Sequence, residues 1–95
     1  MTDTTFTIRR ASADDATAVA RLAALDSASP PTGELLLAEV DGELWAAVEV
    51  DSGAAIADPF RPSGDLVELL HFRAARMRRE LAEPARRLRL LPRAA

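Results

Sequence analysis

The chain has 95 residues, 48% of them hydrophobic, and no cysteine. This predicts one small globular domain and excludes both a second core and stabilisation by disulfides or a zinc–thiolate site. Its net charge of −3 is unevenly distributed: residues 1–70 hold four arginines against thirteen acidic residues, whereas residues 71–95 hold eight arginines against two. The basic C-terminal part can attract an anionic partner, or the two parts can attract each other within one chain or between two copies.

The N-terminal residues and the lengths of the apolar runs predict a cytoplasmic protein without membrane contact. Residues 1–5 lack the basic and then apolar layout of a signal peptide. No apolar run approaches the roughly 20 residues that cross a bilayer.

The first predicted elements are a short strand and a helix. Phe6 and Ile8 alternate with polar residues, which is typical of a strand with one apolar face. Ser12 offers a side-chain oxygen as N-cap and acidic residues follow it, so a helix is predicted from about Ala13 to Asp26. Its apolar residues recur at three- and four-residue spacing and form a stripe that can pack on a sheet.

Two apolar runs around Asp41-Gly42 predict a β-hairpin, because this dipeptide accepts the positive φ angles of a two-residue turn. The turn sets a register with the cross-strand pairs Val40–Glu43, Ala38–Trp45, Leu36–Ala47, Leu37–Ala46 and Leu35–Val48. Both faces of the ribbon are then mostly apolar, so we expect one helix on each face.

A weak third strand over residues 54–57 and a long helix complete the predicted fold. The helix begins at Gly64 or Asp65 with Ser63 as N-cap, and Pro84 ends it. Residues 1–83 form the domain, and residues 84–95 form an Arg-rich tail too short for a stable isolated helix. The predicted class is α+β: a small, mainly antiparallel sheet in the order β-α-β-β-β-α, with a helix on each face.

This order of elements resembles the N-terminal half of the Gcn5-related N-acetyltransferase (GNAT) family. The segment TIRRASADDATAVARLAALD is similar to the family's opening strand and first helix, and LLLAEVDGELWAAVEV to its second and third strands. The segment IADPFRPSGDLVELLHFRAARMRRE is similar to the fourth strand, the phosphate loop and the third helix. The likeness covers residues 5–83.

The resemblance implies an acetyl-CoA loop, in which Arg61, Ser63 and Gly64 fall on the family's pattern. Pro62 stands where a glycine is expected, and it has no N–H to donate. Asp65 would place a carboxylate beside the pyrophosphate, where repulsion at about 4 Å costs roughly 1 to 4 kcal/mol. There is also no tyrosine to act as general acid, and no segment for the family's later strands. We therefore expect a truncated domain with a degenerate loop and no cofactor, unless a second chain completes the site.

Other candidate residues are weighed against ordinary structural roles. Trp45 on the hairpin and Phe72 beside the apolar stripe of the last helix are candidate interface contacts, with burial under a helix as the alternative for Trp45. His71 is the only histidine and is expected at the surface, not in a metal site. Four glutamates beside the hairpin could serve as a general base only with a raised pKa, and are expected to be rim charges: Glu34, Glu39, Glu43 and Glu49.

The C-terminal arginines form a cluster that could neutralise phosphates of a nucleic acid. No aromatic residues or groove-reading motif accompany the cluster, and the acidic part of the chain competes for it. Its members are Arg73, Arg76, Arg78, Arg79, Arg86, Arg87, Arg89 and Arg93.

These observations favour a non-catalytic binding or assembly module that self-associates, since an apolar strand at residues 54–57 would lie at the edge of the sheet. The alternative is an acetyl-CoA-dependent N-acyltransferase whose site is completed across a dimer. A third hypothesis is a nucleic-acid binder that uses the Arg-rich tail. No catalytic residue and no metal ligand is predicted.

Overall fold

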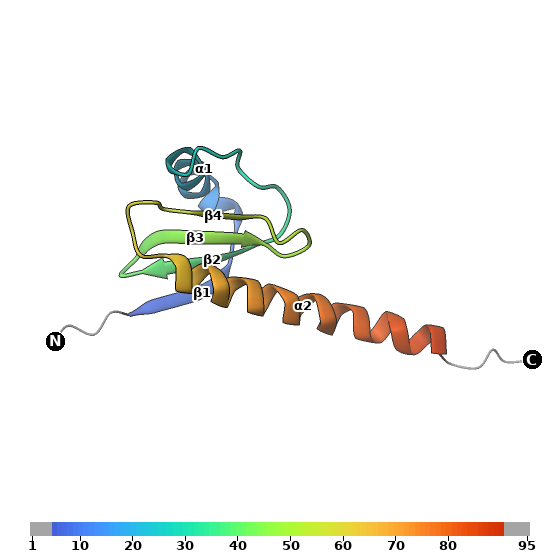
Figure 1. Cartoon of the computed structure of the whole chain (residues 1–95). Coiled ribbons are helices and arrows are strands. Elements are labelled where there is room, and N and C mark those ends of the chain that lie inside the picture. Colours follow the sequence, from blue (N-terminus) through green and yellow to red (C-terminus); the bar gives the residue numbers. More distant parts are fainter. Residues whose placement is uncertain (1–4, 91–95) are drawn as a thin grey trace, which may run out of the picture.

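The computed structural model describes the backbone of residues 5–90 and the side chains of residues 5–82. It confirms the α+β prediction: four antiparallel strands form one sheet in the order β1-β2-β3-β4, with two helices (Figure 1). The elements in chain order are β1 (Phe6–Arg10), the 3-10 turn η1 (Ala13–Asp15), α1 (Ala16–Leu25), β2 (Leu35–Val40), β3 (Glu43–Glu49), β4 (Ala55–Ala57) and α2 (Gly64–Leu90). None of the helices in the described part of the chain is long and apolar enough to span a membrane.

The hairpin turn is where the sequence places it, but the predicted register holds only for the two pairs next to the turn, Val40–Glu43 and Glu39–Leu44. Asp41 and Gly42 have φ angles of 51° and 84°, as a turn with two positive φ values requires. Val40 pairs with Glu43, and an irregularity between Ala38 and Glu39 then shifts the remaining pairs by one residue. Trp45 is the extra residue of this β-bulge, since Glu39 pairs with Leu44 and Ala38 with Ala46.

The bulge also changes which side chains share a face. In the predicted register Glu43 and Glu49 lie on one face of the sheet together with Trp45. In the structure Glu43 is opposite Val40 and Glu49 is opposite Leu35, and these two β2 residues point to opposite faces. The prediction was wrong because a turn dipeptide determines only the nearest pairs, whereas a bulge depends on packing farther along the strands.

Each face of the sheet carries one helix and one cluster of buried side chains. On the α1 side, Val19, Leu22 and Ala23 of the helix pack with Leu35, Leu37, Ala47 and Ile56 of the sheet. On the α2 side, Leu70 and Ala74 pack with Leu36, Ala38, Ala46, Val48 and Val50. Burial on both faces explains why the hairpin sequence is apolar at nearly every position.

α2 continues beyond the predicted end. It extends past Glu83 and Pro84 to Leu90, and Figure 1 shows it projecting well beyond the sheet. Pro84 lacks the N–H that would bond to the carbonyl of Glu80, which costs about 3 kcal/mol in a helix interior. The residues that follow are mostly Ala, Arg and Leu, which are the strongest helix formers, and the helix that precedes Pro84 supplies their nucleus. The prediction treated residues 84–95 as an isolated tail and so missed this continuity.

Candidate functional site

The loop ahead of α2, residues 58–63, is closed by hydrogen bonds of its own. The Arg61 N–H donates to the Asp58 carbonyl at 3.2 Å, and the Ser63 N–H donates to the Arg61 carbonyl at 2.8 Å. Ser63 is buried, and its hydroxyl donates to the Asp58 carbonyl at 3.2 Å. Ser63 occupies the N-cap position, since its carbonyl accepts the Val67 N–H, but the side chain stabilises the loop rather than capping the helix.

Arg61, the predicted anion contact, lies against the protein's own hairpin. Its guanidinium sits 5.4 Å from the centroid of the Trp45 ring, within the range of a cation–π interaction, and Nη2 lies 3.1 Å from Glu43 Oε2. Trp45 itself is half-buried, and its Nε1–H is buried without an acceptor among the described residues. The predicted contact residue Trp45 is thus half-buried, with Arg61 over its ring.

The candidate cofactor residues Arg61, Ser63 and Gly64 therefore lie together, but the side chains of Arg61 and Ser63 contact other parts of the protein. Gly64 and Asp65 are exposed at the first turn of α2, where the backbone N–H groups have no helical partner. Arg61 is directed to Trp45 and Glu43, and Ser63 to the carbonyls of its own loop. Phe60, which precedes Arg61 in this loop, is 81% exposed and was not predicted as a contact residue.

A three-residue ion cluster joins β1, β2 and the start of α1. Arg9 makes a bidentate pair with Asp15, at 2.8 Å from Nη1 and 2.7 Å from Nη2, and its Nε lies 2.6 Å from Glu39. Asp15 also accepts the Ser12 N–H at 2.7 Å. The Arg9 guanidinium, and then the Ser12 N–H, hold the pKa of Asp15 well below its ordinary value. Both carboxylates in turn raise the pKa of Arg9.

The glutamates weighed as general bases have the environment of rim charges. Glu39 faces Arg9, Glu34 lies 3.2 Å from Arg10, and Glu43 pairs with Arg61. These three carboxylates are therefore engaged with arginine side chains of the protein itself. Within the part of the chain that the structure describes, no three acidic or histidine residues group as metal ligands.

α2 is held to the turn between β3 and β4 by two polar contacts. The exposed His71 donates from Nε2 to the Gly53 carbonyl at 2.9 Å, and Arg78 donates to the Val50 carbonyl. The helix contacts β2, β3 and β4. Ala38 and Ala46 beneath it are fully buried, and their small side chains allow it to approach closely. α2 therefore lies mainly over β2, β3 and β4, and Ile8 of β1 packs at the margin of the same core cluster.

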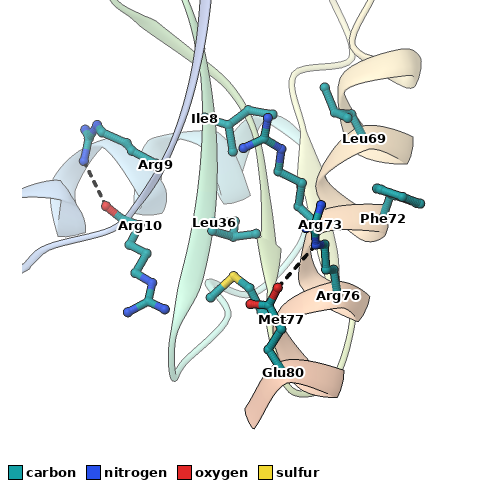
Figure 2. A pocket seen from close by; sticks show the side chains of 10 residues that line it. All are labelled: Ile8, Arg9, Arg10, Leu36, Leu69, Phe72, Arg73, Arg76, Met77 and Glu80. Atoms are coloured by element: carbon teal, nitrogen blue, oxygen red, sulfur yellow. Dashed lines mark hydrogen bonds and ion pairs between the residues drawn. The ribbon is translucent and has the colours of Figure 1, made fainter. Parts of the chain in front are cut away.

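A hollow of about 530 Å³ lies between β1 and α2. Its apolar lining residues are Ile8, Leu36, Leu69 and Met77, and Arg73 and Arg76 of α2 lie beside them (Figure 2). Its other lining residues are Arg9, Arg10, Phe72, Arg73, Arg76 and Glu80. Phe72 is 61% exposed at the rim, in agreement with its predicted place beside the apolar stripe. We refer to this feature as the β1–α2 hollow.

The two edges of the sheet differ in how far their backbone groups are engaged. β4, the predicted edge strand, has three residues, and the Ala57 N–H on its outer side donates to Asp26 Oδ2 at 3.1 Å. β1, at the other edge, has five residues, and its Phe6 side chain is 50% exposed. The exposed edge and the hollow beside it are thus formed by the same strand.

The sequence analysis found neither the β1–α2 hollow nor the ion cluster. The signal for the hollow was present in Phe6 and Ile8, whose side chains lie on the α2 face of an edge strand. Of the arginines expected to form a basic cluster, Arg73 and Arg76 line the hollow, Arg76 pairs with Glu80 on α2, and Arg78 bonds to the Val50 carbonyl. Arg86, Arg87, Arg89 and Arg93 lie outside the described side chains.

No protein-family model, curated protein or solved structure matches this chain. The GNAT resemblance therefore stays a prediction, and function has to be argued from the geometry above.

Proposed function

We propose that this protein is a non-catalytic binding and assembly module that self-associates at the edge of the sheet formed by β1, beside α2. The observation that carries the proposal is the strip of sheet face over β1, which α2 leaves uncovered beside an apolar hollow. A four-stranded sheet is about 19 Å wide at 4.8 Å per strand, whereas one helix with its side chains covers about 10 Å. The strip over β1, at the edge of the sheet, is therefore the part that α2 covers least.

Exposed aromatic residues support this reading. Phe72 of α2 lines the hollow and is 61% exposed, and Phe6, which is 50% exposed, lies on β1 two residues before the lining residue Ile8. Aromatic side chains contribute most to the energy of protein interfaces when a partner buries them. The charge distribution adds to this, since a basic α2 and an acidic remainder of the chain attract each other between copies.

The loop geometry favours a non-catalytic role. A pyrophosphate cradle needs free amides and an available cation, and here the Ser63 N–H and the Arg61 guanidinium are both engaged within the protein. Three of the four carboxylates beside the hairpin, those of Glu34, Glu39 and Glu43, are paired with arginines. This arrangement supports binding and assembly over acyl transfer.

Light scattering over a range of protein concentrations tests the proposal. We expect the mass to rise with concentration towards twice the 10.2 kDa of one chain. Phe6→Asp, which places a charge on the exposed strip, should keep the protein monomeric. Thr17→Asp, on the exposed surface of α1, should behave as wild type. The mass of a single chain at every concentration would reject the proposal.

A further inference from the structure

We propose that two copies pair through β1, antiparallel and about a twofold axis at Ile8, so that the two sheets form one continuous sheet of eight strands. This inference rests on the self-association proposed above and names the surface that carries it. β1 carries backbone groups that β2 does not use.

The outward-facing groups of β1 follow from its register with β2. The Asp41 N–H donates to the Thr5 carbonyl, and the Ala11 N–H donates to the Leu35 carbonyl, so residues 5 and 11 form hydrogen-bonded pairs. Hydrogen-bonded and non-hydrogen-bonded pairs alternate along an antiparallel ladder. The N–H and C=O groups of residues 5, 7, 9 and 11 therefore bond to β2. The N–H and C=O groups of Phe6, Ile8 and Arg10 therefore point away from the sheet. Of these groups, the Arg10 carbonyl has one described contact, from Arg9 Nη1 at 3.3 Å.

Only one register uses all of these groups. With the axis at Ile8, Ile8 pairs with Ile8 of the second copy. Phe6 of each copy pairs with Arg10 of the other, so the three pairs give six backbone hydrogen bonds. An axis at Thr7 or Arg9 leaves one of the three residues without a partner in the opposing strand and gives four. The five-residue strand is thus complementary to itself about its central residue.

The side chains agree with this register. Phe6, Ile8 and Arg10 share the α2 face, because they are opposite Val40, Ala38 and Leu36. The pairing brings the two Ile8 side chains together and sets the exposed Phe6 ring beside Arg10 of the second copy, where cross-strand and cation–π contacts stabilise the pair.

Charge does not oppose the contact, although arginines on an edge strand can prevent pairing between sheets. Arg9 is neutralised in its own chain by Asp15 and Glu39, and Arg10 lies 3.2 Å from Glu34. The other edge is less suited to a second copy. β4 exposes the outward groups of only Ala55 and Ala57, and Asp26 already takes one of the two N–H groups.

Single-cysteine variants test the axis directly, since no native cysteine competes. Residues in a hydrogen-bonded antiparallel pair have Cα atoms about 5.5 Å apart, within the range of a disulfide. On mild oxidation, Ile8→Cys should form a covalent dimer. Thr7→Cys and Arg9→Cys should not, because these residues lie diagonally opposite their own copies and more than about 7 Å apart. A mixture of Phe6→Cys and Arg10→Cys should give the mixed dimer.

The outcomes separate this inference from the function on which it rests. If the wild type dimerises in light scattering but Ile8→Cys stays uncrosslinked, the β1 pairing is wrong and self-association stands. Crosslinking of Thr7→Cys in place of Ile8→Cys overturns the register, and crosslinking of Ala55→Cys instead assigns the contact to β4. A monomeric wild type overturns both proposals.

Discussion

Replacement of Leu70 by alanine tests whether the first half of α2 holds the α2 side of the fold together. Leu70 is fully buried, and the residues that it covers include Ala38 and Ala46, which are fully buried and have only a methyl group with which to fill a cavity. Leucine-to-alanine changes at such sites cost about 2 to 5 kcal/mol, and a site that cannot collapse lies towards the upper end. A domain of this size has roughly 5 to 14 kcal/mol in total at about 0.05 to 0.15 kcal/mol per residue.

Leu81→Ala is the matched control, because it makes the same chemical change on the same helix at a position that is 64% exposed. We expect a loss below about 0.5 kcal/mol for this variant. Urea denaturation at one fixed protein concentration measures both, since a change in midpoint at constant slope reports stability. The melting temperature of Leu70→Ala should fall by at least about 10 °C. Equal losses for the two variants would refute the reasoning, because the projecting part of α2 would then be as buried as the part on the sheet.

Three further predictions concern the ion cluster and the loop. Asp15→Asn should be less stable than wild type at pH 7. The folded state lowers the pKa of Asp15, so its contribution to the free energy of unfolding is present above the unfolded pKa of about 4 and is lost as the pH falls below it. The difference in stability between variant and wild type should therefore shrink as the pH is lowered in acid denaturation. A difference that is constant with pH would contradict this. Arg61→Ala should change the fluorescence of Trp45 and cost less than about 1 kcal/mol, as expected for an exposed cation–π pair; unchanged emission would place the guanidinium elsewhere. Acetyl-CoA should leave the melting temperature unchanged, whereas a ligand at 100 times its dissociation constant adds about 2.7 kcal/mol. A rise would favour the transferase alternative.

The parts of the fold that sequence could predict are those with local causes. Asp41-Gly42 sets a turn through two φ angles, and the apolar stripes at helical or strand spacing place the elements and their buried faces. The bulge at Trp45 has no such local cause, because it depends on packing farther along the strands and not on the turn residues. The predicted helix end at Pro84 was wrong because the prediction considered the cost of one proline and not the helix formers on either side of it.

The candidate site was harder to predict, because it depends on where α2 lies across the sheet. That position follows from long-range contacts, of His71 with Gly53 and of Arg78 with Val50, and neither pair has a sequence signature. Phe72 was singled out because it lies off the stripe of its helix, which is a local property. The hollow beside it, and the exposed edge of β1, required the relative placement of two elements.

Amide hydrogen exchange of β1 tests the central claim of self-association through this strand most directly. In dilute protein the N–H groups of Phe6, Ile8 and Arg10 should exchange rapidly, while those of Thr7 and Arg9 are protected by β2. At high concentration the account predicts that protection extends to Phe6, Ile8 and Arg10. Rapid exchange of these three amides at every concentration would contradict it.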